Sequence, residues 1–214
     1  MSLATFGGIK AEVALRMARS DKTAQIPGFI QIAHGKMMRG HKRGRDWLVP
    51  PLRFDGMLQE ADLTPSEGVA DLPTDFLQAK QLVTDTLGAP PLRFMPQSQF
   101  KGSGLYTSSG IPQFYTIEAG QILIMPKNTN VLTLDYYGLI ATPSVDADTN
   151  AIMTTIPHAY LFGALAEAFA QARNMDMAAY YEAEFAGTIA AANETDSLSE
   201  TSGDFLIARP GIIP

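Results

Sequence analysis

The stretch NAIMTTIPHAYLFGALAEAFAQARNMDMAAYYEAEF, residues 150–185, decides the helical part of the fold. Asp148 or Asn150 can cap a short first helix. That helix must stop at Ile156, because the residue before a proline is driven out of the α region. Pro157 then begins a second helix, since the first turn of a helix does not use that N–H as a donor.

The second helix of this stretch carries apolar residues at spacings of three and four, which predicts a buried face. We expect four of them to form the core of a helical bundle or its packing between subunits: Tyr160, Leu161, Leu165 and Phe169. The sequence RNMD ends this helix, and Asp176 is placed to cap a last one. The many alanines permit close helix approach.

Residues 3 to about 46 are predicted to form two more helices. Their apolar stripes are Ile9, Val13 and Met17 in the first helix, and Ile30, Ala33 and Met37 in the second. Pro27 suits the first turn of the second helix.

Between residues 47 and 142 prolines recur and forbid long helices. Two β-rich runs flank the turn EAGQ, and a third follows KNTN, which predicts a three-stranded meander. The run at 121–125 has apolar residues on both faces, so both faces of that strand must be covered.

These patterns together predict an α+β fold. An α-helical bundle is formed by N-terminal helices (1–46) and C-terminal helices (143–195), with an antiparallel β domain (47–142) inserted between them. Residues 196–214 form an extended C-terminal tail, in which a polar tether precedes FLIARPGIIP. Such an apolar segment must fold back as a strand or dock on a partner.

The composition excludes several classes of protein. There is no cysteine, so disulfides and thiolate chemistry are absent, as expected for a reducing cytosol. The N-terminus is a poor signal peptide, and no apolar run is long enough to span a membrane. The formal net charge is −6, which disfavours a protein that coats nucleic acid.

No catalytic, cofactor or metal site is expected. His34, His41 and His158 lack the further ligands that a zinc site needs, so we expect them at the surface or at an interface. Neither a dinucleotide fingerprint, nor a phosphate-binding loop, nor a nucleophile elbow is present. An enzyme of unrecognised type, acting in the β region, stays an alternative.

A basic cluster lies at the end of the second helix. It holds five of the sixteen positive charges of the chain: Lys36, Arg39, Lys42, Arg43 and Arg45. The cluster is either a solvated helix end or a contact for phosphates or an acidic partner. Trp47 follows it and can anchor the helix end in the core or at an interface.

Two motifs resemble the phage head-to-tail adaptor proteins. IPGFIQIAHGKMMRGHK, residues 26–42, follows RMARSD and is similar to the family's Ile-Pro-x-Phe-Ile-x-Leu-Ala segment and its arginine-rich helix end. Residues 135–170 are similar to the family's second half, with Pro-x-x-Tyr-Leu and Ala-Leu-Ala-Glu-Ala. This second motif lies at Pro157, Tyr160, Leu161, Ala164, Leu165, Ala166, Glu167 and Ala168. The chain departs from the family at His34, where an acidic residue is frequent, and at the glycines 35, 40 and 44.

The resemblance implies a structural protein of the virion and not an enzyme. Such adaptors form a homo-oligomeric ring, usually of twelve copies, beneath the portal protein at the neck between head and tail. The ring extends the channel through which genomic DNA passes without sequence-specific binding, and a downstream tail, stopper or nozzle protein binds below. Assembly in the bacterial host cytoplasm, with no cofactor and no membrane, is implied as well.

The resemblance also suggests roles for two segments. We expect Phe205, Leu206, Ile207 and Arg209 of the tail to dock on the portal or on a neighbouring adaptor. We expect the basic cluster to contact a partner. The alternative is a sequence-independent DNA-binding protein that uses the cluster at 36–45.

Overall fold

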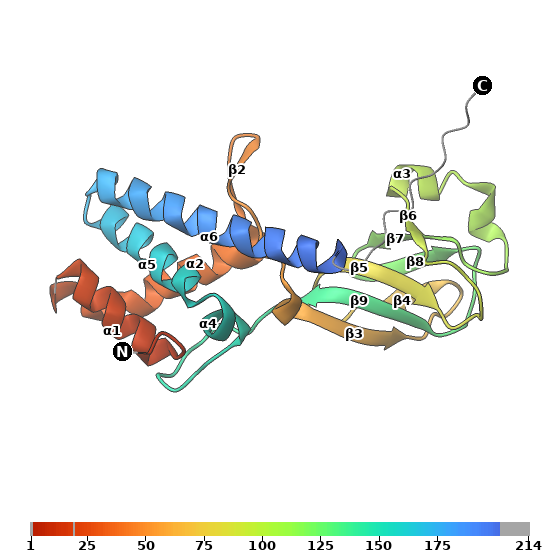
Figure 1. Ribbon diagram of the computed structural model, residues 1–214. Helices are drawn as coiled ribbons and strands as arrows, with labels where there is room; N and C mark the ends of the chain where they lie inside the picture. The colour runs from red at the N-terminus through yellow and green to blue at the C-terminus, as the bar shows by residue number, and fades with distance from the viewer. Residues whose placement is uncertain (1, 19, 202–214) are drawn as a thin grey trace, which may run out of the picture. The chain divides into compact units, whose positions relative to one another are not determined.

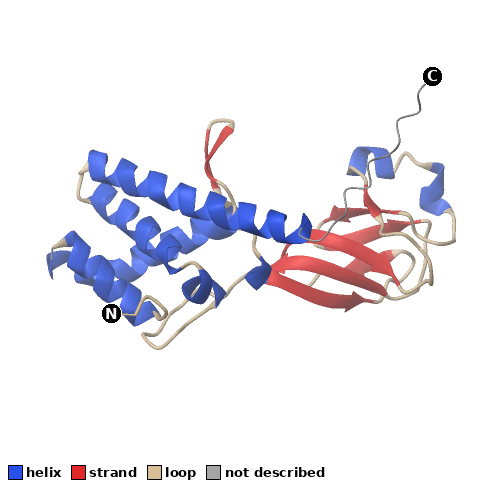
Figure 2. Ribbon diagram, in the orientation of Figure 1, coloured by secondary structure: helices blue, strands red, loops and turns tan. Residues whose placement is uncertain are grey.

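The computed structural model describes residues 2–18 and 20–201, and its fold is of the α+β class. Two units are present. Met1–Asp55 and Thr142–Pro214 form the helical unit, and Gly56–Ala141 forms the β unit. Long helices belong to the first unit and most strands to the second (Figure 2).

Helices α1 (Phe6–Met17) and α2 (Ile26–Arg39) are joined by the 3-10 helix η1 (Ser20–Gln25). The Thr5 side chain caps α1 by accepting a hydrogen bond from the backbone N–H of Gly8. Both predicted apolar stripes are buried, and Pro27 lies in the first turn of α2, so these predictions are confirmed.

The prediction that helix continues to residue 46 is wrong. Helix α2 ends at Arg39 because Gly40 takes a φ of +72°, outside the helical region. The chain then forms an antiparallel hairpin of β1 (His41–Arg43) and β2 (Asp46–Val49), joined by the two residues Gly44 and Arg45. Of the three glycines at which the chain departs from the family, Gly40 therefore ends the helix, Gly35 lies within it, and Gly44 lies in the turn of the hairpin.

The opening stretch folds largely as predicted. Asn150 caps α4 (Ala151–Thr155) by accepting a hydrogen bond from the N–H of Met153 at 3.0 Å. This helix ends before Pro157, where α5 (Pro157–Gln171) begins.

The last helix differs from the prediction at both ends. Helix α6 (Met175–Thr201) is capped by Asn174, which accepts a hydrogen bond from the N–H of Met177 at 3.3 Å, and not by Asp176. Residues 196–201, expected in the extended tail, are helical. The tail residues Phe205, Leu206, Ile207 and Arg209 lie outside the described residues.

Helix α5 is the centre of the helical unit and packs against α1, α2, α4 and α6 (Figure 1). Gly163 allows α2 to approach closely, because a Cβ at this position would lie 2.7 Å from the Cβ of Ala33. Helices from both ends of the chain thus share one core.

The β unit contains two sheets. The three-stranded sheet has the order β3 (Leu58–Leu63), β9 (Leu132–Gly138), β5 (Phe76–Thr84), and all of its pairs are antiparallel. The four-stranded sheet has the order β4 (Val69–Asp71), β8 (Gln121–Met125), β7 (Phe114–Glu118), β6 (Arg93–Phe94), and only β6 and β7 are parallel. Three short helices complete the elements: η2 (Asp55–Met57), α3 (Gln97–Phe100) and η3 (Gly104–Thr107).

Side chains of both sheets form one core. Its buried members are Leu63, Ala70, Leu82, Leu92, Tyr115, Ile122, Ile124, Leu132, Leu134 and Tyr136. The opposite face of β8 is covered too, because Leu123 and Met125 cluster with Phe100. The prediction that both faces of this strand are covered is confirmed.

The predicted meander is correct only for its first two strands. Strands β7 and β8 form the hairpin, but β9 pairs with β3 and β5 in the other sheet. Strand β8 pairs with β7 on one side and with β4 on the other, so neither of its edges is open to β9.

Candidate functional site

The five residues of the predicted basic cluster separate into two groups. Lys36 and Arg39 belong to the last turn of α2. The Lys36 Nζ lies 2.5 Å from Glu167 Oε1 of α5 and 3.6 Å from Glu182 Oε1 of α6. Lys36 therefore links α2 to α5 and α6, and its charge is paired with carboxylates of its own unit.

Lys42, Arg43 and Arg45 lie on residues 41–49, which we call the basic hairpin. All three side chains are exposed, and the hairpin stands out from the helices of its unit (Figure 1). Trp47 is 47% exposed, so it anchors no helix end in the core. Its ring packs against Gly40 and lies 4.2 Å from the Lys42 Nζ, which holds the base of the hairpin together.

Arg45 is the outermost cation of the basic hairpin. Asp46 is the register partner of Arg43, so a carboxylate lies on the strand opposite it. Arg43 also lines a groove of about 240 Å³ on the helical unit, beside Glu167 and Glu182. Arg45 occupies the two-residue turn, and within the described part of the chain no carboxylate forms an ion pair with it.

The β unit carries the opposite charge. Its eight acidic and four basic residues give a net charge of −4. Glu60 of β3 is the direct register partner of Asp135 of β9, so two carboxylates face the same side of the three-stranded sheet. Like charges at directly opposed positions destabilise a sheet.

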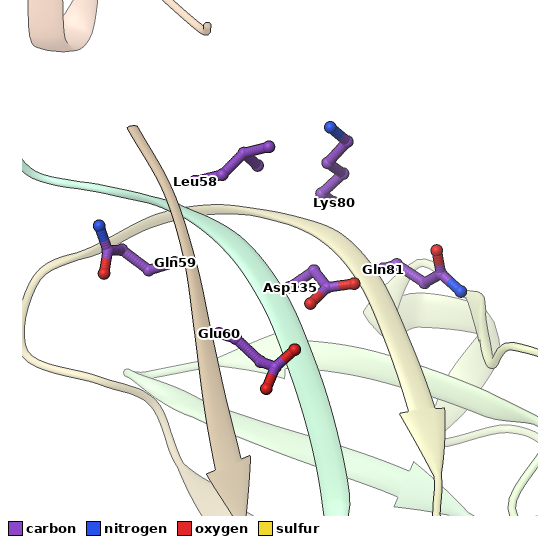
Figure 3. Close-up of a pocket in the computed structure, with 6 residues that line it drawn as sticks. All are labelled: Leu58, Gln59, Glu60, Lys80, Gln81 and Asp135. Atoms are coloured by element: carbon purple, nitrogen blue, oxygen red, sulfur yellow. The ribbon is translucent and has the colours of Figure 1, made fainter. Parts of the chain in front are cut away.

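These carboxylates line a hollow of about 340 Å³, which we call the acidic hollow (Figure 3). The residues that line it are Leu58, Gln59, Glu60, Lys80, Gln81 and Asp135. The Lys80 side chain rises from β5, and its Nζ lies 5.7 Å from the centre of the Tyr137 ring. Glu60, Asp135 and Lys80 sum to a charge of −1. Sequence reasoning missed this hollow, because no local signal gives the register of strands so far apart.

A polar network is buried in the helical unit. The Tyr160 hydroxyl is 2.7 Å from His34 Nδ1, and it accepts a hydrogen bond from Asn150 Nδ2 at 3.0 Å. The expectation that His34 lies at a surface or interface is wrong, because its side chain is only 4% exposed. Burial raises the pKa of Tyr160 to about 12. The network joins α2, α5 and the cap of α4.

The other three residues of the predicted helical core are not equivalent. Leu161 and Leu165 are fully buried with Tyr160, whereas Phe169 is only half-buried. The Phe169 ring stacks on Tyr181 at 5.5 Å between centroids. Further rings continue this row along α5 and α6, namely Phe162, His158 and Tyr180.

Residues 2–18 and 20–201 contain no group of three or more histidine or acidic residues that could hold a metal ion. None of their helices combines the length and the apolar character needed to cross a bilayer.

The chain is similar to a known protein family. The family model described as SU10 adaptor protein matches residues 4–204, which is nearly the whole chain and includes both sequence motifs. No curated protein matches the chain.

Proposed function

Because the chain belongs to the SU10 adaptor protein family, a family of structural phage head–tail adaptors, we propose that it forms the adaptor ring below the portal. The family match over residues 4–204 carries this proposal. The chain is a structural protein of the virion. We place it at the neck, in a homo-oligomeric ring of about twelve copies that extends the DNA channel and joins head to tail.

The proposed partners follow from this position. The portal protein lies above the ring, and a downstream tail, stopper or nozzle protein lies below. The ring is assembled in the bacterial host cytoplasm. Genomic DNA passes through it without sequence-specific binding.

The acidity of the chain suits this passage. Twelve copies at −6 each carry −72. Negative charge on the channel wall repels phosphates and lowers adhesion, so that the duplex can slide.

Each part of the chain has a role in this proposal. The helices from both ends form the rigid bundle that packs against its neighbours, with the half-buried Phe169 and Tyr181 at that contact. The tail residues Phe205, Leu206, Ile207 and Arg209 dock on the portal or on a neighbouring adaptor. A truncation after Glu200 should therefore weaken portal binding, and unchanged binding would count against this role.

Electron microscopy of the purified protein, alone and mixed with its portal, tests the function. The expected result is a ring stacked coaxially on the portal. A chain that stays monomeric and ignores the portal would refute the proposal.

The exposed basic hairpin supports one alternative, a DNA-binding protein without sequence preference. Such a protein would bind duplex tightly as a monomer and lose affinity steeply as salt increases. Replacing Arg39 and Arg43 by glutamate would abolish that binding. The adaptor binds duplex weakly in the same assay.

A further inference from the structure

We infer that the basic hairpin of one copy docks into the acidic hollow of the next copy, with the Arg45 guanidinium between Glu60 and Asp135. This inference rests on the proposed ring and names the residues of a contact that would build it. It uses two surfaces that lie on different units of the same chain.

The first argument concerns the hollow. Glu60 and Asp135 are register partners on adjacent strands, so their mutual repulsion destabilises the free sheet. A cation placed between them converts this repulsion into attraction. The charges of the hollow sum to −1, so that one guanidinium neutralises it.

The second argument concerns the hairpin. Arg45 lies at its tip and stays exposed, whereas Lys42 lies over the Trp47 ring and Arg43 faces Asp46. A two-residue turn is narrow enough to bring this side chain to a concave surface. Guanidinium is the group best suited to bridge two carboxylates, because its planar donors can bind both at once.

The third argument concerns geometry. A hairpin on one unit that docks on the other unit of the next copy is a head-to-tail contact. Each copy then uses its hairpin once and its hollow once, and such heterologous contacts build a ring when the rotation between successive copies closes. A second copy of this chain is therefore the occupant that fits both surfaces.

The experiment measures self-association of the full chain by analytical ultracentrifugation and ring occupancy on the portal by electron microscopy. Four proteins are compared: the unaltered chain, Arg45→Glu, the double variant Glu60→Gln with Asp135→Asn, and the control Arg93→Glu. The control makes the same charge change at an exposed cation on the other sheet. We expect the two test variants to associate at least ~10-fold more weakly and the control to match the unaltered chain.

A mixture of the two test variants identifies the contact. The hairpin of the double variant and the hollow of Arg45→Glu are both intact, so one contact can form. The reverse contact cannot. We expect equal amounts to form pairs that do not grow further. If the hairpin instead docked into the hollow of its own chain, mixing the two variants would give no pairs. The absence of pairs would therefore overturn the inference.

Thermal unfolding checks that each variant is folded and adds a second readout. The double variant Glu60→Gln with Asp135→Asn removes the repulsion between the two carboxylates, so it should leave the free chain as stable or more stable while association weakens. Loss of both stability and association would assign these two residues a structural role and overturn the inference.

The remaining outcomes separate the inference from the proposed function. If rings form and Arg45→Glu assembles normally, the inference fails and the adaptor function stands. If the unaltered chain neither associates nor binds the portal, both fail. If Arg45→Glu weakens duplex DNA binding and leaves self-association unchanged, the hairpin binds nucleic acid instead of a second copy, and the inference is overturned.

Discussion

The Tyr160 hydroxyl is the residue-scale feature on which the helical core most depends. It is fully buried and bonded to His34 and Asn150, which come from distant parts of the sequence. We expect Tyr160→Phe to lower the free energy of unfolding by about 1–2 kcal/mol, because the buried His34 and the partly buried Asn150 each lose a hydrogen bond. Urea denaturation measures this loss.

The control for that variant is Tyr180→Phe, since Tyr180 is 55% exposed and makes a ring contact that phenylalanine preserves. The control should change the free energy of unfolding by less than about 0.5 kcal/mol. Equal effects of the two variants would mean that the buried network contributes nothing specific.

Alkaline pH should act through the same hydroxyl. Burial raises the pKa of Tyr160 to about 12, whereas a tyrosine in the unfolded chain titrates near its ordinary value of about 10. Since the folded pKa is the higher one, the stabilisation is complete below pH 10 and is lost as pH rises from about 10 to about 12. Two pKa units correspond to about 3 kcal/mol.

Unfolding free energies measured across this pH range compare the native chain with Tyr160→Phe. Other buried tyrosines contribute to both proteins, so the difference between them isolates Tyr160. That difference should shrink as pH rises above 10. A constant difference would show that Tyr160 titrates equally in the folded and unfolded chains.

The sequence indicates burial at the residue scale better than it indicates partners. The expectation that His34 lies at a surface or interface rests on its missing metal ligands, whereas its place beside Ala33 in the buried stripe of α2 favours burial. Its partner Tyr160 is 126 positions away, and no local rule joins the two. Glu60 and Asp135 were missed for the same physical reason, since strand register arises from the whole sheet.

At the element scale, the contact of α2 with α5 depends on Gly163. A Cβ there would lie 2.7 Å from the Cβ of Ala33, and closer than 3.4 Å to the Phe185 ring. We expect Gly163→Ala to destabilise the protein by about 1–3 kcal/mol through overpacking, despite the better helix propensity of alanine. Adding Ala33→Gly should recover part of that loss, as thermal unfolding can measure.

Gly187 of α6 is the matched control. It lies within the helix, and no atom lies within 4 Å of the Cβ that alanine would add. Gly187→Ala should therefore stabilise the protein by up to about 1 kcal/mol. If both glycines respond alike, close packing at Gly163 is not the reason for its presence.

The sequence predicts the end of a helix well where a single capping residue or proline sets that end. Asn150 and Pro157 fixed the ends of α4, because capping and the proline restriction act within a few residues. The basic hairpin was read as helix because its short strands carry charged residues with no alternating pattern. Strand β9 was joined to the wrong sheet because competition from β4 for the edge of β8 is a tertiary effect.

At the scale of the whole molecule, the β unit is an insertion in the sequence of the helical unit, and the strands at which the chain enters and leaves the β unit pair with each other. Leu58, near the start of the β unit, is the register partner of Tyr137, near its end. The Cα atoms of these two residues are therefore only about 5 Å apart. On the helical side, Asn193 of α6 binds the backbone of Pro51 and Arg53 and fixes the chain as it leaves.

This arrangement predicts that the two units fold independently. The β unit has its own core between two sheets, and paired strands close its ends, so residues 56–141 expressed alone should unfold cooperatively on heating. A chain in which a short Gly/Ser linker replaces residues 56–141 should likewise keep its helices, because α5 packs against four helices of its own unit. Circular dichroism and calorimetry test both. If either piece melts without a cooperative transition, its core is incomplete without the other, and the two units form one folding unit instead of a scaffold with an inserted domain.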